Sequence, residues 1–260
     1  RGADGRREIP FRILVAADGA RSRIARVENM PRPPVFLAGL QVDILHRIEQ
    51  SRVEIHPDAS PEFFGWAIPI GQGRARVGLA GTRNVKDRMT RFLAQVGQDS
   101  HTVEVHFVSG TIPLGTMART YGNRVLFLGD AAGMAKPTSG GGVYTGVRAA
   151  RHAARVIGEA FLRNDCSDAL LSEYEKSWKY DFGRELELGM RLFRIRQGIS
   201  SADMSRIIAA LGDPAICEDI VRLGDMDRPG ALIRRLLMRP SLYHLLGILI
   251  KTEVCRIYKE

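Results

Sequence analysis

The sequence predicts a mixed α/β (α+β) fold, and three observations support this class. Two short apolar runs, Phe11–Ala17 and Arg124–Leu128, have the length of buried strands, and each is followed by an Asp and a helical pattern. The segment between them contains alternating and aromatic runs that predict antiparallel strands. Residues 164–260 carry apolar side chains at helical spacing.

We expect four parts along the chain. Residues 1–30 and 111–163 together form part of one α/β domain, and residues 31–110 form an inserted antiparallel-sheet domain on the substrate side. Residues 164–260 form a helical region. The proline-rich connector at 30–34 predicts the passage into the inserted sheet.

The composition limits the classes of protein to consider. The 260 residues are 45% hydrophobic and 26% charged, which is typical of a globular protein. The formal charge of +9 favours an anionic ligand or surface, and no nucleic-acid-binding signature accompanies it. No apolar run reaches the roughly 18 residues of a membrane-spanning helix. The spacing of Cys166, Cys217 and Cys255 predicts neither a disulfide framework nor a metal site.

The inserted segment is predicted to be mostly strands. The expected strands are Val35–His46, Arg52–His56, Glu62–Pro69, Arg74–Ala80 and Thr102–Val108. One side of the first strand would carry Phe36, Ala38, Leu40, Val42 and Ile44. Gly71 and Gly73 fall in a hairpin turn, because a strand and not a helix follows them. The spacing of apolar residues predicts a helix over Val85–Val96.

The rest of the chain is predicted to be helical. The expected helices are Ala149–Leu162, Asp168–Tyr180, Asp181–Arg196, Ser201–Leu211, Ala215–Leu223, Leu232–Met238 and Leu242–Tyr258. Pro229 and Pro240 interrupt the pattern. The apolar stripes indicate a helix–helix core, and an apolar tunnel for a long ligand is the alternative.

The segment from Arg124 to Gly158 combines three features that suit a ligand. Asp130 lies just past a predicted strand, where open α/β sheets bind ligands. The glycines Gly140–Gly142 allow a ligand close to the backbone. The helix that follows offers free N–H groups to an electron-rich group. A strand, a turn and a helix with a glycine-rich connection would give the same pattern without a ligand.

The residue order of this segment resembles that of a known family. Gly-Asp-Ala-Ala-Gly from Gly129, followed after six residues by three glycines, resembles the second flavin-binding motif of glutathione-reductase-type flavoproteins. Lys-Pro-Thr-Ser-Gly-Gly-Gly-Val-Tyr-Thr-Gly resembles the geranylgeranyl reductase family, particularly its archaeal lipid-reductase branch. The resemblance implies FAD as cofactor, with Asp130 on the ribityl chain. It also implies that Pro137, the glycines Gly140, Gly141 and Gly142, and the helix start at Val143 lie against the isoalloxazine ring.

A second motif lies near the start of the chain. Asp18-Gly19-Ala-Arg21-Ser-Arg23 follows a predicted strand and resembles the Asp-Gly motif of flavin hydroxylases and reductases. The resemblance implies that Asp18 and Gly19 lie near the riboflavin and pyrophosphate part of FAD. Arg21 would add positive charge near phosphate. A solvated basic turn explains the two arginines equally well.

An aromatic element lies in the inserted sheet. Phe64-Gly-Trp66-Ala-Ile-Pro69 resembles the aromatic-x-Trp-x-x-Pro element of the geranylgeranyl reductases, which lines the pocket between flavin and isoprenoid chain. Aromatic side chains suit a long apolar substrate and a flat ring. Phe64 stands where many relatives have Tyr, so no hydroxyl is available there. The core of the sheet is the alternative place for Phe64 and Trp66.

The resemblance implies reduction of carbon–carbon double bonds in geranylgeranyl chains of membrane lipids, with the flavin reduced first. The electron donor is left open among reduced pyridine nucleotide, ferredoxin and deazaflavin, and no catalytic residue is assigned. Tyr144 and His152 are weighed as proton donors, and a structural role is weighed against each. Pro113 and Leu114 are expected near the ring.

Two other classes of function stay open. One is a related flavoprotein, either an FAD-dependent monooxygenase or an electron-transfer flavoprotein-type oxidoreductase. The other is a basic fragment that binds lipid surfaces without catalysis. We expect a cytoplasmic protein that contacts the membrane periphery, with Arg234, Arg235, Arg239 and Lys251 as candidates for meeting lipid phosphate. Because no Gly-x-Gly-x-x-Gly unit follows a strand near Arg1, we expect this chain to be the carboxyl-terminal portion of a longer protein.

Overall fold

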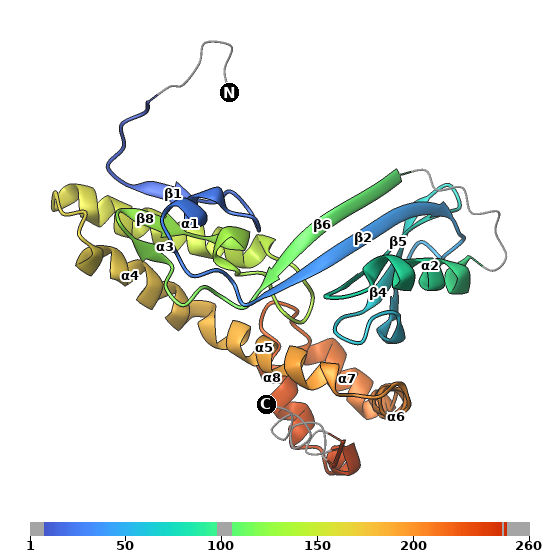
Figure 1. Cartoon of the computed structure of the whole chain (residues 1–260). Coiled ribbons are helices and arrows are strands. Elements are labelled where there is room, and N and C mark those ends of the chain that lie inside the picture. The colour runs from blue at the N-terminus through green and yellow to red at the C-terminus, as the bar shows by residue number, and fades with distance from the viewer. Residues whose placement is uncertain (1–7, 98–105, 246, 249–260) are drawn as a thin grey trace.

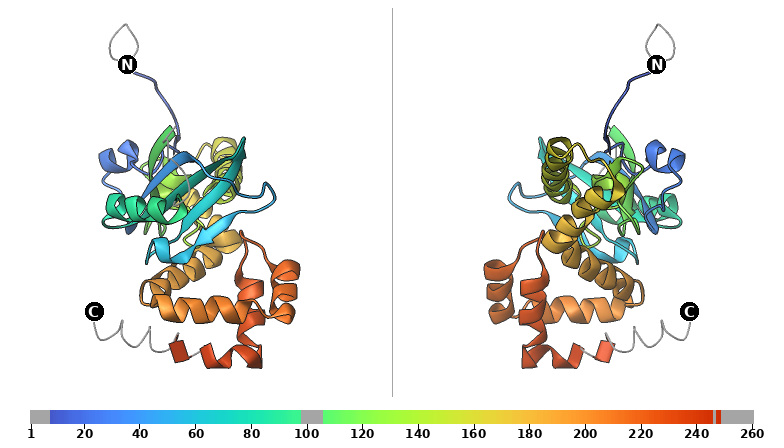
Figure 2. Two further views of the ribbon diagram at one scale, coloured as in Figure 1. Left: turned by 90° about the vertical axis from the view of Figure 1, so that its right-hand side faces the viewer. Right: turned by 90° about the vertical axis from the view of Figure 1, so that its left-hand side faces the viewer.

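The computed structural model describes residues 8–97, 106–245 and 247–248. A small sheet packed with helices α3 and α4 lies at one end of the molecule, and a larger sheet with α2 lies at the other (Figure 1). The helices that follow α4 form a separate layer beneath the strands in both side views (Figure 2). The mixed α/β class predicted from the sequence is confirmed.

The small sheet contains β1 (Leu14–Ala16), β8 (Val125–Phe127) and β7 (Tyr121–Gly122), in that order. β1 runs parallel to β8, with Ala16 opposite Phe127. Both predicted strands exist, and both are shorter than predicted. The first strand begins at Leu14 and not at Phe11, whose side chain is 51% exposed and does not pack into the core.

Helices α3 (Val143–Leu162) and α4 (Asp168–Trp178) pack side by side on this sheet. Two buried aromatic residues of α4 fix its position through hydrogen bonds. The Tyr174 hydroxyl donates to the carbonyl of Phe127 at 2.7 Å, and the Trp178 indole N–H donates to Thr120 Oγ1 at 3.0 Å. Their polar atoms are therefore satisfied inside an otherwise apolar core.

The larger sheet has the order β3-β4-β5-β2-β6 and is antiparallel throughout. Its strands are β2 (Val35–Leu45), β3 (Glu54–His56), β4 (Gly65–Gly71), β5 (Arg74–Gly81) and β6 (His106–Leu114). The predicted hairpin between β4 and β5 is confirmed, and Gly71, Gln72 and Gly73 all have positive φ there. The helix predicted over Val85–Val96 is α2. The predicted strand Thr102–Val108 falls partly outside the described residues.

The buried face of β2 changes along the strand. At its far end Val42 and Ile44 pack against Met89 and Phe92 of α2. At its near end Leu37, which points to the opposite face, is fully buried, whereas Ala38 is exposed. The side predicted from alternation is therefore buried only at its Val42–Ile44 end, because each end of the strand lies over a different core.

The helical region begins as one long rod. α4 continues through a π-helical turn (Lys179–Gly183) into α5 (Arg184–Gln197). The sequence predicted the two helices and not the π turn. The remaining helices are α6 (Ser201–Leu211), α7 (Pro214–Leu223) and α8 (Gly230–Leu237), followed by a 3₁₀ turn at Pro240–Leu242. Most of the predicted helix Leu242–Tyr258 lies outside the described residues.

The short α1 (Arg23–Val27) follows β1, and the chain then passes into β2. It returns from the larger sheet along β6, which runs without interruption through residue 110. Leu114, the last residue of β6, forms a parallel bridge with Ala135. The predicted division at 110 therefore lies inside a continuous strand, and the four-part division remains a proposal.

Candidate functional site

Both sequence motifs lie at one edge of the small sheet, because β1 and β8 are parallel neighbours. Asp18 follows β1 after one intervening residue, and Asp130 follows β8 after two. Ligands of open α/β sheets bind at the carboxyl ends of the strands. Segments more than a hundred residues apart are thus brought together where a cofactor would bind.

The Asp130 carboxylate is half-buried and unpaired. Among the described residues nothing donates a hydrogen bond to it or forms an ion pair with it, and burial raises its pKa. A Cβ atom added to Gly142 would lie 2.8 Å from Asp130 Oδ1. Gly142 therefore leaves the space that this carboxylate occupies. An unsatisfied carboxylate of this kind suits a ligand that brings hydroxyl groups.

The loop between Asp130 and α3 is held by its own backbone. The Lys136 N–H donates to the Gly141 carbonyl at 2.9 Å, and the Gly140 N–H donates to the Lys136 carbonyl at 2.7 Å. The buried Thr145 hydroxyl donates to the carbonyls of Met134 and Gly142 at 2.7 and 3.1 Å. The turn at Gly140 has a φ of +72°, which favours glycine.

Helix α3 begins directly after this loop, and its cap residue is Gly142, which has no side chain to cap the helix. Among the described residues, no side chain accepts a hydrogen bond from the first turn of the helix. Since the first N–H groups of a helix have no intrahelical partner, they are available to an electron-rich group. Val143 is 82% exposed at this end. The predicted helix start thus presents donors next to Asp130.

Two further glycines of the motifs face open space. Gly19 has a φ of +84° and Gly129 a φ of +60°, and no heavy atom lies within 4 Å of a Cβ built on either. Nothing in the described part of the chain therefore fills the space beside these turns. Arg21, two residues after Gly19, is exposed.

Asp18 differs from Asp130 because its carboxylate is already used. Its Oδ2 accepts from the N–H groups of Arg23 at 2.7 Å and Ile24 at 3.3 Å. Burial raises the pKa of Asp18, but hydrogen bonds from Ser22, Ile24 and Arg23 outweigh this and lower it. Asp18 therefore holds the start of α1, which gives it a structural role whether or not it also contacts a cofactor.

An aromatic cluster faces the glycine loop. The rings of Phe63 and Phe64 stack at 4.2 Å between centroids, and Trp66 meets Phe64 edge-on at 6.1 Å. A Cβ on Gly140 would stand 3.3 Å from Phe63 Cζ and 3.4 Å from Ile112 Cδ1. The loop therefore contacts the aromatic end of the larger sheet, and a side chain at Gly140 would push the two apart.

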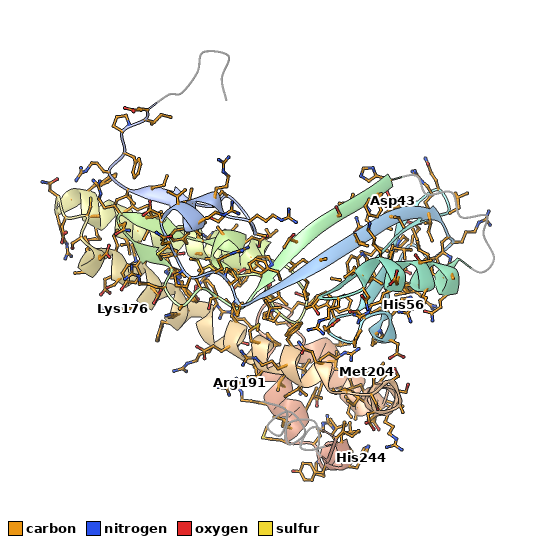
Figure 3. The ribbon with its side chains drawn as sticks, in the orientation of Figure 1. Asp43, His56, Lys176, Arg191, Met204 and His244 are labelled. Atoms are coloured by element: carbon orange, nitrogen blue, oxygen red, sulfur yellow. The ribbon has the colours of Figure 1, made fainter. Side chains whose placement is uncertain are left out.

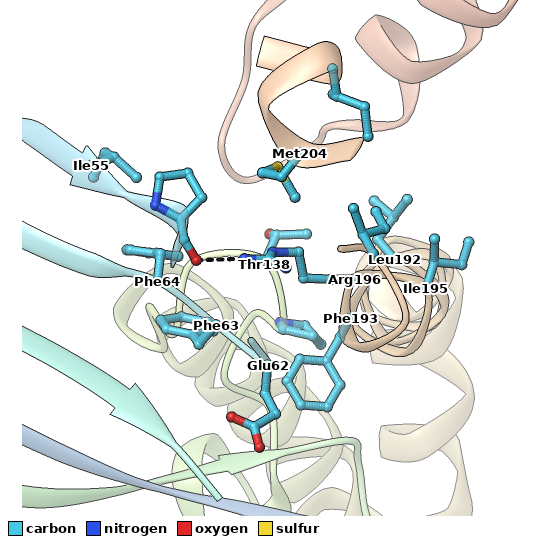
Figure 4. Close-up of a pocket in the computed structure, with 14 residues that line it drawn as sticks. Ile55, Glu62, Phe63, Phe64, Thr138, Leu192, Phe193, Ile195, Arg196 and Met204 are labelled. Carbon is cyan, nitrogen blue, oxygen red and sulfur yellow. Dashed lines mark hydrogen bonds between the residues drawn. The ribbon is translucent and has the colours of Figure 1, made fainter. Parts of the chain in front are cut away.

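A cavity of 390 Å³ lies beside this cluster (Figure 4). Phe64 and Pro137 line it, as do residues from α5 and α6. The apolar side chains from these two helices are Leu192, Phe193, Ile195, Met204 and Ile207. A cavity of this size with an apolar lining fits part of a long hydrocarbon chain.

The remaining predicted substrate residues do not line this cavity. Trp66 packs over Gly78, where a Cβ would stand 2.5 Å from the indole ring, and it donates to Gln41 Oε1 at 3.2 Å. Pro69 lies four residues further along the chain from Gly65, in the part of β4 near the hairpin. Of the three predicted substrate residues, Phe64 alone is among the residues that line the cavity.

The charged residues at the cavity wall are tied to the protein. Arg196 donates to the carbonyls of Pro57 and Ser60 at 2.5 and 3.3 Å, and burial lowers its pKa. Glu62 accepts from Thr82 Oγ1 at 2.8 Å and from Arg88 at 2.6 Å. Burial raises the pKa of Glu62, but these hydrogen bonds lower it overall. We therefore do not assign Glu62 as a proton donor.

The residues weighed as proton donors are engaged elsewhere. His152 Nε2 lies 2.9 Å from Asp181 Oδ2, and the Tyr144 hydroxyl contacts Arg228. Leu114 is fully buried and forms the bridge to Ala135, which places this predicted neighbour beside the motif loop. Pro113 is buried in the same strand.

Arg235 and Arg239, two of the residues expected to meet lipid phosphate, share one buried carboxylate, and that expectation remains a prediction. Both guanidinium groups bind Asp219, at 3.0 and 2.8 Å, and this carboxylate is only 2% exposed. They hold α8 and the turn after it against α7. Arg234 is exposed, and Lys251 lies outside the described residues.

Sequence reasoning missed most of the cavity wall. Leu192, Phe193 and Arg196 follow the helical spacing of α5, a signal that equally describes packing against another helix. Met204 and Ile207 repeat that ambiguity on α6. The cavity is therefore visible only once the helices are placed beneath the larger sheet.

The fold defines an α/β protein with a strand-end site of the kind that flavoproteins use and an apolar cavity beside it. The family model described as lycopene cyclase protein matches residues 74–210. An uncharacterised protein of Methanocaldococcus jannaschii is 32% identical over 232 residues, 85% of this chain and 59% of that protein. Digeranylgeranylglycerophospholipid reductase 2 of Methanopyrus kandleri is 30% identical over 262 residues, 93% of this chain and 64% of that protein.

A solved structure supports the same fold. The geranylgeranyl bacteriochlorophyll reductase-like protein of Thermoplasma acidophilum superposes with a TM-score of 0.77 at 19% identity, over 91% of this chain and 62% of that one. Because the matched residues 74–210 make up just over half of the chain, it belongs to the family that the lycopene cyclase model describes. Within that family it is similar to the curated digeranylgeranylglycerophospholipid reductases. It spans about three fifths of the length of the curated relatives it matches.

Proposed function

We propose that this chain supplies the ring end of the cofactor site and the substrate cavity of an FAD-dependent reductase that saturates double bonds in geranylgeranyl chains of lipids. The names of the relatives support the reaction class. The observation that carries the proposal is the contact between the glycine loop, with its unpaired Asp130, and an aromatic cluster beside an apolar cavity.

The residues around Asp130 fit the flavin end of FAD. Asp130 would accept from hydroxyl groups of the ribityl chain, because its carboxylate has no other donor among the described residues. We assign the contacts with the ring to Pro137, to the glycines Gly140–Gly142 and to Val143, because the uncapped start of α3 stabilises negative charge.

The turn after β1 would support the remainder of the cofactor. Gly19 and Gly129 leave open space beside the two strand ends, which permits close approach to the backbone. Arg21 adds a positive charge at the same edge, and Asp18 positions the turn by holding α1. FAD supplies the hydride chemistry of such enzymes, and the protein supplies binding and orientation.

The cavity would hold the apolar chain of the substrate. Its wall from α5 and α6 would exclude water from the hydrocarbon. Phe64 lines the cavity and stacks on Phe63, which contacts the glycine loop. We propose that Trp66 and Pro69 support Phe64 from within the sheet. Since Glu62 is held by Arg88 and Thr82, we assign it no part in proton transfer.

The finer partners also belong to this proposal. We propose a cytoplasmic protein that works at the membrane periphery, because its substrate would be a membrane lipid. No helix in the described part of the chain is long and apolar enough to cross a bilayer. Reduced pyridine nucleotide, ferredoxin or deazaflavin would supply electrons.

The test uses the full-length protein that contains this chain. It is purified with bound flavin, reduced anaerobically and incubated with a geranylgeranyl glycerophospholipid, and the lipid is analysed by mass spectrometry. We expect mass gains in steps of two hydrogens. Oxygen incorporation with consumption of pyridine nucleotide would support the monooxygenase alternative. A protein without flavin absorbance that still binds lipid would support the non-catalytic alternative.

A further inference from the structure

A second hollow lies away from the apolar cavity, between α3 and the π turn that joins α4 to α5. Its volume is about 900 Å³, and it is open to solvent. Lys176, which lines it, lies toward the opposite end of the α4–α5 rod from Met204, which lines the apolar cavity (Figure 3). We call this hollow the basic groove.

Positive charge dominates the described lining of the basic groove. Its cationic side chains are Arg148, Arg155, Lys176, Arg184 and Arg228, and its carboxylate is Asp181. Helix spacing explains the arrangement, since Arg148, His152 and Arg155 fall on one face of α3. The groove is therefore a place where anions are attracted.

Asp181 organises one side of the groove. Arg148 binds it with two hydrogen bonds of 2.8 and 2.6 Å, His152 Nε2 lies 2.9 Å from it, and Arg228 reaches it at 3.4 Å. Its side chain is 12% exposed. Asp181 lies in the π turn, and such turns often occur at functional sites. One carboxylate thus holds three basic groups in place and neutralises one positive charge.

The other side of the groove carries two guanidinium groups that form no ion pair among the described residues. Within that part of the chain, Arg155 donates a hydrogen bond to the neutral Ser177 hydroxyl alone, at 2.6 Å. Arg184 has no hydrogen bond or ion pair among the described residues and is exposed. Lys176 pairs with Glu173 at 2.7 Å. Two guanidinium groups, from α3 and from α5, are therefore available to a ligand.

We propose that the basic groove binds a phosphate ester between Arg155 and Arg184. A guanidinium group presents planar paired donors that match the oxygens of a phosphate, and two such groups on separate helices define a position for it. The Ser177 hydroxyl, which donates to the Glu173 carbonyl at 2.6 Å, holds Arg155 in place and does not itself face the ligand. Arg228 makes a long hydrogen bond of 3.4 Å to Asp181 and is a third cationic group in the lining that could donate to the phosphate.

The size of the groove and Tyr180 indicate an organic ester. A volume of about 900 Å³ lies within the range of small-molecule sites. Tyr180 is 92% exposed at the groove and offers a flat apolar face. The ester could belong to a phospholipid headgroup or to a nucleotide. Both present the same phosphate to the same arginines.

The groove also lies close to the proposed cofactor site. Arg228 contacts the Tyr144 hydroxyl in the first turn of α3, and its neighbour Asp227 forms an ion pair with Lys136 of the glycine loop. The segment from Asp227 to Arg228 therefore contacts both sites. The binding proposal itself does not depend on the proposed reaction.

The test measures binding by calorimetry to the full-length protein at constant ionic strength. One arm uses monomeric dihexanoyl phosphatidic acid, a second uses NADPH, and inorganic phosphate competes in both. The variant is R155Q/R184Q. The matched control is R151Q/R194Q, which removes two exposed arginines from the same helices outside the groove and changes the net charge equally.

We expect the variant to lose affinity for one of the two esters by about tenfold or more, since two charge-assisted contacts are lost. The control should stay within about twofold of the wild type, a difference of less than half a kcal/mol. The arm that shows the loss identifies the source of the ester. An equal loss of affinity in variant and control would mean that net charge alone causes the effect, and this would overturn the proposal. Absence of binding to either ester would also overturn it.

Both variants change exposed side chains, and circular dichroism of each checks that folding is retained. Lipid reduction by the full-length protein is measured separately. Loss of phosphate-ester binding with unchanged flavin content would concern the groove alone. Failure of the reduction assay would concern the proposed function alone.

Discussion

Asp18 and Asp130 occupy corresponding places in the molecule, since each follows a strand of the same parallel pair. Their carboxylates differ in what they bind. Asp18 accepts two backbone hydrogen bonds from α1, whereas Asp130 has no donor among the described residues. The comparison teaches that the same strand-end motif can stabilise its own turn or remain free for a ligand.

Among the substitutions that test this difference, Asp130→Ala should have the largest effect. If the free carboxylate binds the ribityl hydroxyls, its removal costs one or more charge-assisted hydrogen bonds, and flavin affinity falls by about ten- to hundredfold. Stability of the flavin-free protein should not fall, because no donor among the described residues loses a partner. Flavin titration of the full-length protein measures the first effect. Unchanged flavin affinity would contradict the assignment.

Gly142→Ala tests the space that the carboxylate occupies. A φ of −117° is suitable for alanine, so the effect is steric: the new methyl group would lie 2.8 Å from Asp130 Oδ1. We expect about a tenfold loss of flavin affinity, the equivalent of one displaced hydrogen bond. The control is Gly158→Ala in α3, because a Cβ built on Gly158 has no neighbouring atom within 4 Å among the described residues. An equal effect of both substitutions would show that helix propensity, not Asp130, is responsible.

Asp18→Ala should affect stability more than binding. The substitution removes the acceptor for the N–H groups of Arg23 and Ile24, and loss of such a cap costs about 1 kcal/mol. Chemical denaturation measures this change. A loss of flavin affinity as large as that of Asp130→Ala, with no change in stability, would remove the distinction between the two carboxylates.

The smallest expected effect is a difference in pH dependence. The pKa of Asp130 is raised above its ordinary value of 3.8, so its contribution favours the folded state at low pH and is lost as pH rises through the folded pKa. The pKa of Asp18 is lowered, so its contribution is present above 3.8 and is lost as pH falls.

Thermal unfolding of Asp130→Asn and Asp18→Asn between pH 3 and 7 measures this difference, each variant being compared with the wild type at the same pH. Relative to the wild type, Asp130→Asn should gain stability toward neutral pH, and Asp18→Asn should lose it. Parallel pH profiles for the two variants would contradict the assigned directions.

Those parts of the candidate site that are contiguous in the chain could be proposed from the sequence, and their role in binding remains a prediction. Asp130, the glycine turn and the start of α3 lie within one segment, and local chemistry decides each of them. The helix over Val85–Val96 was likewise predicted with its observed bounds, because its apolar spacing is regular.

What could not be predicted depends on tertiary contacts. The buried side of β2 changes along the strand because two cores lie on opposite faces, and alternation alone has no information about either. Asp219 is one of many acidic residues until α7 and α8 place it among Arg222, Arg235 and Arg239. The cavity wall of α5 and α6 likewise forms only through tertiary contacts and could not be predicted from the sequence.

The π turn at Lys179–Gly183 has a geometric consequence for the cavity. An α-helix advances about 100° per residue, so the additional residue of a π turn rotates everything beyond it by about that angle. Upstream, Trp178 faces the small sheet, and downstream, Phe193 faces the cavity. Deleting one residue of the turn would restore a regular helix and swing Phe193 out of the wall. The face that α5 presents to the cavity is thus set by one additional residue in the turn before it.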